Sequence, residues 1–346
     1  MTSGAERDRA IELGRWRAHA PGRVNLIGDH TDYMGGPVLP MAVQLGTTIV
    51  ATRGEDRIEL TSADEDDVAL VPLPVTDASA ARPPWARYVA GVAQVLGSTV
   101  GLRGRVGTTL PVGAGLSSSA ALEVATALAL GDDGAPRDVA RRCQHAEQLA
   151  TGVPCGVMDQ FASCAGRAGH AMLLDCDTLD VRHVRVPQDA RVWVIHSGAP
   201  RSLAGSAYAR RRAECERATR TVGPLPTAEP ARIEAIVDPV ERARARHVHS
   251  ESARVRRAAD ALEHGDLELV GRYMRESHRS LREDFEVSTP RLDELVDHLC
   301  GIDGVLGARL TGAGFGGCVV ALARPGVELE GWHVVPSDGA RVERVD

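Results

Sequence analysis

The sequence predicts a mixed fold of strands and helices, divided into about two domains. Its 346 residues exceed the size of one ordinary hydrophobic core. Strand-like patterns occur in both halves of the chain, at 36–52, 58–73 and 191–196, and segments of helical periodicity separate them. We place the domain boundary near residue 185, just before the strand expected at 191–196, so the expected domains are 1–185 and 186–346.

The expected helices are recognised by apolar residues at helical spacing or by runs of strong helix formers. They are 85–96, 120–130, 137–150, 206–222, 239–263 and 267–285. Two glycine-rich turns stand before other elements. The turn at 111–115 precedes the first alanine-rich helix, and the turn at 311–317 precedes a strand expected at 318–322.

Charge and composition exclude several classes of function. The chain carries 40 basic and 47 acidic residues, a net charge of −7, so it offers no basic surface for nucleic acid or an anionic membrane. No apolar run approaches the roughly 18 residues that span a bilayer. Every basic residue is arginine, and the absence of lysine excludes a P-loop lysine and Schiff-base chemistry.

Cysteine usage and the first residues indicate a cellular compartment. The seven cysteines are odd in number and form no CxxC pair, which argues against a disulfide framework or a zinc cluster. Residues 1–9 are polar and charged, unlike a signal peptide. We therefore expect a cytoplasmic protein.

The segment 111–120, Pro-Val-Gly-Ala-Gly-Leu-Ser-Ser-Ser-Ala, predicts an anion site. Its glycines let the backbone approach a ligand, and its serines open a strong helix whose free amides and positive dipole end attract phosphate. The alternative is a turn with a serine N-cap. One serine would suffice for a cap, so three consecutive serines favour phosphate binding.

Two acidic residues stand in apolar surroundings. Glu147 follows Cys143 by four residues, on the apolar face of its helix, where a carboxylate is costly unless it is paired or binds a metal. It is either an Mg²⁺ ligand or a boundary residue that reaches solvent. Asp159 lies between Met158 and Phe161 and is either a base or a structural cap.

A dense polar cluster follows a hydrophobic strand near the start of the chain. Within 20–33 the residues Arg23, Asp29, His30 and Asp32 bring many hydrogen-bonding groups together. Such a cluster suits a polyhydroxylated ligand, because each buried hydroxyl needs a partner. The alternative is a solvated turn. For the glycine run at 311–317, taken by itself, a tight turn without function is the favoured interpretation.

Together these segments resemble the GHMP kinases, a group that contains galactokinase and the homoserine and mevalonate kinases. The serine-rich loop is similar across the group, whereas 22–33 and 155–160 resemble its galactokinase branch, as do 201–212 and 277–288. The resemblance runs over about residues 20 to 322. It implies an α+β, two-domain fold. A left-handed βαβ unit would lie in the N-terminal domain, a ferredoxin-like α/β domain would follow, and the active site would lie in the cleft between them.

The resemblance also implies roles for individual residues. Asp159 would be the catalytic aspartate, with Arg23 beside it, and Ser119 and Glu147 would bind Mg²⁺. The residues that would hold the sugar are Arg23, Asp29, His30, Asp32, Gly156, Asp159 and Tyr208. The residues that would bind ATP are Trp85, Tyr88, Gly113, Ala114, Gly115, Leu116, Ser117, Ser118, Ser119 and Gly314.

The implied reaction is ATP-dependent phosphorylation of the anomeric hydroxyl of α-D-galactose, which gives galactose 1-phosphate and ADP. A kinase for a related sugar, such as N-acetylgalactosamine or galacturonate, is an alternative, and so is a non-catalytic galactose sensor of the same fold. The expected partners are the sugar and ATP, bound to a monomer without nucleic acid or membrane.

Two departures from the galactokinase pattern carry expectations of their own. Asp29 stands where most galactokinases carry glutamate, and its side chain is shorter by about 1.5 Å, one carbon–carbon bond. Only 324–331 separates the strand expected at 318–322 from the apolar segment 332–335. The family usually has a helix there, so we expect that surface helix to be missing or trimmed.

Overall fold

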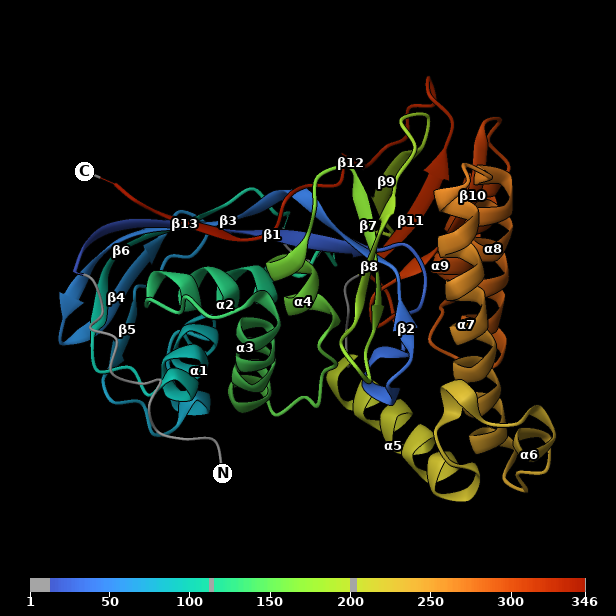
Figure 1. Cartoon of the computed structure of the whole chain (residues 1–346), viewed down its shortest axis with the longest axis horizontal. Helices are drawn as coiled ribbons and strands as arrows, with labels where there is room; N and C mark the ends of the chain where they lie inside the picture. The colour runs from blue at the N-terminus through green and yellow to red at the C-terminus, as the bar shows by residue number, and fades with distance from the viewer. Residues whose placement is uncertain (1–12, 112–114, 200–203, 346) are drawn as a thin grey trace.

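A six-stranded sheet and a four-stranded sheet organise the chain (Figure 1). The computed structural model describes residues 13–111, 115–199 and 204–345. The strands of the first sheet, in order across it, are β13 (Arg341–Arg344), β1 (Gly14–Asn25), β3 (Pro40–Glu55), β6 (Gly101–Thr108), β4 (Arg57–Ser62) and β5 (Ala69–Pro72). Its pairs are antiparallel except β4 with β6, which run parallel and are joined through β5 and a helix.

Helices cover one face of this sheet, as Figure 1 shows. They are α1 (Ala86–Leu96), α2 (Ser118–Ala129), α3 (Pro136–Thr151) and α4 (Met158–Ala165). Small apolar side chains of α2 and α3 pack with Ile49, Ile58 and Leu60 of the sheet into one buried cluster. The helix α2 packs on β1 and β3, and the Arg23 N–H donates to the Leu116 carbonyl, so the start of α2 lies near the C-terminal end of β1.

The second sheet has the order β10 (Val305–Thr311), β11 (Cys318–Ala323), β9 (Arg191–His196) and β12 (Trp332–Val334), and every pair is antiparallel. The helices of this half are α5 (Ala204–Val222), α6 (Pro230–Glu234), α7 (Pro239–Glu263), α8 (Leu267–Glu283) and α9 (Pro290–Cys300). Local chemistry sets where α7 begins. The Asp238 side chain accepts hydrogen bonds from the N–H groups of Val240 and Glu241, and Pro239 takes the first helical position.

A small third sheet joins the two halves. It consists of β2 (Pro37–Val38), β7 (His170–Asp175) and β8 (Val181–Arg185). The boundary expected near residue 185 falls between β8 and β9, which belong to different sheets. However, β13 leaves the second half and pairs with β1, so the last strand of the chain lies in the first sheet. The division into 1–185 and 186–346 therefore remains a prediction, and it does not account for the pairing of β13 with β1.

Most of the expected elements are confirmed. The strand at 191–196 and the helix at 239–263 have the expected bounds, and the other helices differ by one or two residues at an end. The helix expected at 120–130 begins earlier, at Ser118, which places two serines of the glycine-rich segment inside it. Most of 36–52 forms one long strand, β3, and no helix lies between β11 and β12, as expected. Several observed elements had no counterpart among the expected ones: the helices α4, α6 and α9 and the strands β6, β7, β8, β10 and β13.

None of the helices in the described part of the chain is long and apolar enough to cross a membrane. Among the described residues, the buried side chains form three clusters: one under the first sheet, one between the halves and one under the second sheet. The middle cluster joins Val24 and Leu116 to Val255 of α7 and Val320 of β11. The inner end of β1 and the start of α2 are therefore fixed by apolar contacts to both halves.

Candidate active site

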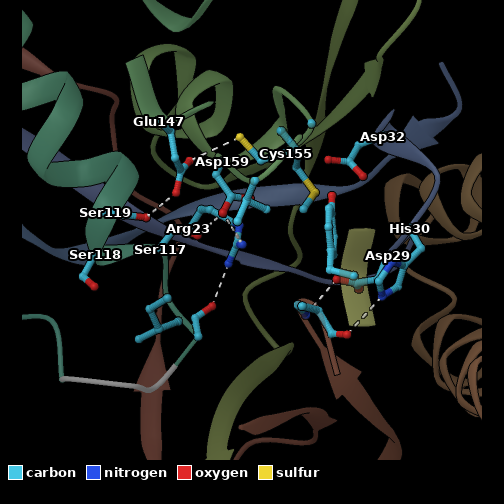
Figure 2. Close-up of a pocket in the computed structure, with 18 of the residues that line it drawn as sticks. Arg23, Asp29, His30, Asp32, Ser117, Ser118, Ser119, Glu147, Cys155 and Asp159 are labelled. Atoms are coloured by element: carbon cyan, nitrogen blue, oxygen red, sulfur yellow. Dashed lines mark hydrogen bonds and ion pairs between the residues drawn. The ribbon is translucent and has the colours of Figure 1, made fainter. Parts of the chain in front are cut away.

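A cavity of about 320 Å³ lies where the two halves meet, and side chains from both halves line it (Figure 2). Its size falls within the usual range for small-molecule sites. Of the residues expected at the site, the cavity wall includes Arg23, Asp29, His30, Asp32, Gly115, Leu116, Ser117, Ser118, Ser119, Glu147, Gly156, Asp159 and Tyr208. In Figure 2 the serines and Glu147 lie on one side of Asp159, whereas Asp32, His30 and Asp29 lie on the other.

The remaining expected residues are not on this wall. Gly113 and Ala114 lie outside the described residues. The described lining does not include Trp85, Tyr88 or Gly314. The Trp85 indole N–H donates to the Asp67 carbonyl, and a Cβ added to Gly314 would lie 2.4 Å from the Val287 carbonyl. The ATP contacts expected of these residues remain predictions.

Arg23 reaches the cavity because β1 is irregular at Gly22. The register of β1 against β3 shifts between Pro21 and Arg23, and a side chain at Gly22 would collide with the Leu116 carbonyl, 2.4 Å from an added Cβ. The bulge directs the guanidinium of Arg23 at Asp159. Its Nε and Nη2 donate to the two carboxylate oxygens at 2.7 and 2.6 Å. This is the bidentate geometry of a strong ion pair.

The Arg23–Asp159 pair also forms hydrogen bonds with two residues of the glycine-rich loop. The third donor of Arg23, Nη1, bonds to the Gly115 carbonyl at 2.7 Å, and the hydroxyl of Ser117 donates to Oδ2 of Asp159 at 2.5 Å. Arg23 is 5 % exposed. Burial opposes its charge, but Asp159 and the neighbouring acids outweigh that effect and raise the pKa of Arg23. Asp159 is thus held in one orientation by two elements far apart in the sequence.

The N-terminus of α2 is open to a ligand. Ser117 occupies the cap position with φ 58° and ψ 53°, a left-handed conformation that costs energy for a residue other than glycine. Its side chain makes no capping hydrogen bond to the helix, because its hydroxyl bonds to Asp159 instead. The first amides of α2 therefore keep their donors for an anion, and the cap that was the alternative reading is absent at Ser117.

Glu147 and Ser119 form an oxygen-rich corner beside this helix end. The Ser119 hydroxyl donates to Oε1 of Glu147 at 3.0 Å, and both residues line the cavity. Burial, and next the Asp159 carboxylate, raise the pKa of Glu147. Within 13–111, 115–199 and 204–345, no group of three or more His, Cys, Asp or Glu side chains gathers around a metal position. One carboxylate and one hydroxyl fit Mg²⁺, which commonly takes its remaining ligands from phosphates and water.

On the other side of Asp159, Asp32 faces Gly156. A Cβ added to Gly156 would lie 1.8 Å from Oδ2 of Asp32, so only glycine leaves room for this carboxylate. Burial, together with the negative charge of Asp159, raises the pKa of Asp32 to about 7. An acid with this pKa can change its protonation state when a ligand supplies hydrogen bonds.

His30 is neutral and buried, and its two hydrogen-bond partners determine which ring nitrogen carries the proton. Its Nε2 lies 3.2 Å from the Ala313 carbonyl, which only accepts, so Nε2 carries the proton. Its Nδ1 then accepts from the Tyr33 hydroxyl at 3.0 Å. Burial lowers the pKa of His30 to about 3. The ring of Tyr208, whose centroid lies 5.6 Å from that of His30, completes this end of the wall.

Asp29 is engaged by protein groups on both oxygens. Its Oδ1 accepts from the Gly312 N–H at 2.7 Å, and its Oδ2 accepts from the Asn25 amide at 3.0 Å and faces the Arg309 guanidinium at 2.6 Å. Asp29 is 2 % exposed and Arg309 is fully buried. Asp29 therefore links the first half to β10, and its part in binding a sugar remains a prediction.

Some groups near the cavity were not expected from the sequence. Gly312 and Ala313 line it instead of Gly314, and Cys155 and Met158 complete the wall beside Gly156. Arg309 carried a readable signal, because it is a charged residue in the middle of an apolar strand. For the lining residues Gly312 and Ala313, the sequence contains no signal beyond the glycine run to which they belong.

Comparison with known proteins gives matches along most of the chain. Three family models match: the galactokinase galactose-binding signature over residues 12–53, the GHMP kinases N terminal domain over 87–167 and the GHMP kinases C terminal region over 258–332. Human galactokinase is 44 % identical over 338 residues, which covers 92 % of this chain and 84 % of the human protein. The chain belongs to the galactokinase family.

Other galactokinases support the same placement. The dog (Canis lupus familiaris) galactokinase is 42 % identical over 338 residues, with 92 % of this chain and 84 % of that protein covered. The crystal structure of Lactococcus lactis galactokinase complexed with galactose superimposes with a TM-score of 0.88 at 30 % identity, and 97 % of each chain is covered. The galactokinase signature contains Arg23, Asp29 and Asp32, and the N terminal domain match contains Ser119, Glu147 and Asp159.

Proposed function

We propose that this chain transfers the γ-phosphate of ATP to O1 of α-D-galactose, giving galactose 1-phosphate and ADP. One observation carries the proposal. The Asp159 carboxylate, fixed by Arg23 and Ser117, lies in one cavity between the open N-terminus of α2 and the polar residues of the first motif. A phosphate donor and a hydroxyl acceptor can therefore meet at a carboxylate, as phosphoryl transfer requires.

Each group in this arrangement has a task that follows from its chemistry. The amides of Ser118 and Ser119 would hold phosphate oxygens, and Asp159 would orient the O1 hydroxyl and accept its proton as the O1–phosphorus bond forms. Arg23 would keep Asp159 ionised and offset charge on the transferring group. Ser119 and Glu147 would hold Mg²⁺, which neutralises phosphate charge when it is bound. Asp32 would accept hydrogen bonds from sugar hydroxyls, and His30 would bond to the sugar in exchange for its present bond to Tyr33 or Ala313.

The test is an ADP-release assay with galactose, N-acetylgalactosamine and galacturonate in parallel, followed by ³¹P NMR of the product. We expect turnover with galactose and a phosphate resonance coupled to the anomeric proton. Turnover with another sugar but not with galactose would overturn the substrate. Binding of ATP and galactose without ADP formation would identify a sensor in place of an enzyme.

Glu147→Gln is expected to raise the Mg²⁺ concentration needed for half-maximal rate by about tenfold or more, because the amide cannot supply a charged oxygen ligand. The oxygen of the new amide can accept from Gln160 while its N–H₂ group donates to the Ser119 hydroxyl oxygen, so the local packing is expected to survive the change. Titration of Mg²⁺ at fixed ATP and saturating galactose measures this shift.

The matched control for this variant is Glu294→Gln. It makes the same chemical change on α9, at a side chain that is 68 % exposed and does not line the cavity. The control should leave the Mg²⁺ titration unchanged. A Glu147→Gln titration that coincides with wild type would contradict the assignment of Glu147 as a metal ligand.

The raised pKa of Asp32 predicts a pH dependence for galactose use. Below a pH of about 7 this side chain is protonated in the free protein and accepts fewer hydrogen bonds from hydroxyl groups. We therefore expect kcat/KM for galactose to rise as the pH increases through about 7 and then to level off, since kcat/KM reports the free enzyme. Asp32→Asn should remove this step, and a wild-type profile that is flat across about one pH unit on either side of 7 would contradict the role of Asp32.

A further inference from the structure

Two buried side chains behind the metal-binding corner have no part in the roles described so far. Glu123 lies on α2, four residues after Ser119, and Gln160 follows Asp159 on α4. Both residues are fully buried, and neither lines the cavity. The amide nitrogen of Gln160 donates to Oε2 of Glu123 at 2.9 Å and to Oε2 of Glu147 at 2.6 Å. Gln160 therefore links Glu123 to Glu147.

If Glu123 were ionised, two oxygen atoms of this link would lack a hydrogen-bond donor. Both N–H groups of Gln160 are used, one for each carboxyl group. Oε1 of Glu123 and Oε1 of Gln160 are buried and have no donor among the residues that the structure describes. Turning the amide over would point its oxygen at two carboxylates and lose both bonds. A buried acceptor without a donor is costly, and here two of them belong to side chains that are already bonded to each other.

We propose that Glu123 is a neutral carboxylic acid that forms a two-bond pair with Gln160, and that this pair positions the Glu147 carboxylate for the metal. In this pair the Gln160 N–H donates to Oε2 of Glu123, and the Glu123 hydroxyl at Oε1 donates back to Oε1 of Gln160. A single proton thereby satisfies both of the oxygens that lack donors. The second N–H of Gln160 is then fixed in direction and holds Oε2 of Glu147.

The pair explains how one of two acids in an apolar region carries the charge. Burial, and next the Glu147 carboxylate, raise the pKa of Glu123 well above its usual range. Both oxygens of Glu147 accept hydrogen bonds, Oε1 from Ser119 and Oε2 from Gln160, and these bonds favour its ionised form. Two neighbouring acids in an apolar region rarely ionise together, so Glu147 carries the charge while Glu123 stays neutral.

The direct test of the proton needs neither metal nor substrate. An infrared difference spectrum of wild type against Glu123→Gln, taken on the protein without ligands, should contain the C=O band of a protonated carboxyl group that only wild type has. Isotope labelling of glutamate should shift that band. The absence of such a band would overturn the neutral state of Glu123, whatever the activity of the protein.

The positioning role rests on the proposed function of Glu147 and has its own test. Glu123→Gln keeps one acceptor and one donor, so the Mg²⁺ dependence of ATP-analogue binding should stay within about threefold of wild type, whereas Glu123→Leu and Gln160→Met should weaken it by about 10–100-fold. Thr126→Val is the matched control: it removes a different buried hydrogen-bonding group from α2, and it should lower stability without changing the Mg²⁺ dependence.

The outcomes separate this inference from the proposed function. If Glu147→Gln leaves the Mg²⁺ dependence unchanged, the metal assignment fails while the infrared result still stands. If Glu147→Gln weakens Mg²⁺ binding but Gln160→Met does not, the positioning role is wrong. Should Glu123→Leu not fold, Gln160→Met and Glu123→Gln decide the question, because equal losses in both would require an ionised Glu123.

Discussion

Asp159→Asn is expected to lower kcat by about 10²–10⁴-fold while leaving the affinity for ATP within about threefold of wild type. The amide is close in shape but cannot accept the hydroxyl proton, and its N–H₂ group faces donors on Arg23 and Ser117. Galactose affinity should fall less than kcat, since other groups on the wall also hold the sugar. Single-turnover kinetics and calorimetric titration with an ATP analogue measure these two effects separately.

Asp132→Asn is the matched control for this variant. Asp132 forms a similar bidentate pair with Arg142, at 2.8 and 2.6 Å, but it does not line the cavity. The control should lose stability and keep its turnover. An Asp159→Asn protein with near-normal kcat would show that the carboxylate does not take part in the transfer, and the proposed mechanism would then be wrong.

Arg23→Lys is expected to lower kcat/KM by about 10–100-fold, because lysine keeps the charge but loses the two-point contact with Asp159. Arg23→Met should act more strongly and should also lower the free energy of unfolding by about 3 kcal/mol, at the low end for a broken buried pair. The low end applies because the Asp159 side chain is 28 % exposed and solvent screens it. Chemical denaturation and steady-state kinetics provide the two measurements.

Arg142→Lys separates the catalytic effect of Arg23→Lys from a general loss of an arginine–aspartate pair. Arg142 has the same two-point contact with an aspartate, outside the cavity wall. We expect it to change stability and not kcat/KM. Equal kinetic losses in Arg23→Lys and Arg142→Lys would mean that the Arg23 contact acts only through the fold.

The sequence predicted those parts of the fold whose causes are local. Asp238 and Pro239 mark the start of α7, and a short run of apolar residues marks β9, and both elements have the expected bounds. The serine run was predicted to be an anion site because glycine, serine and alanine have local conformational preferences, and that assignment remains a prediction. The pairing of β13 with β1 was missed, because four exposed residues at Arg341–Arg344 carry no apolar pattern that would indicate a partner.

The site was predicted in outline, mainly through the resemblance to the galactokinase branch. From residue types alone, Glu147 and Asp159 could each have a structural or a functional role, because the role depends on partners that are distant in the sequence. Arg23 and Asp159 are 136 residues apart, and the Asp29 partner Gly312 is 283 residues away. Glu123 gave no sign of its environment, since a glutamate in an alanine-rich helix is compatible with either solvent or burial until the packing of α4 is known.

The return of β13 to the first sheet has a mechanical consequence. The chain passes between the six-stranded and four-stranded sheets twice, on the way to β9 and again after β12. On the second passage the Ser337 and Gly339 amides bond to the carbonyls of Ala42 and Gly166. Two connections, together with the apolar cluster shared by the halves, restrict rotation of one half against the other more than a single connection would.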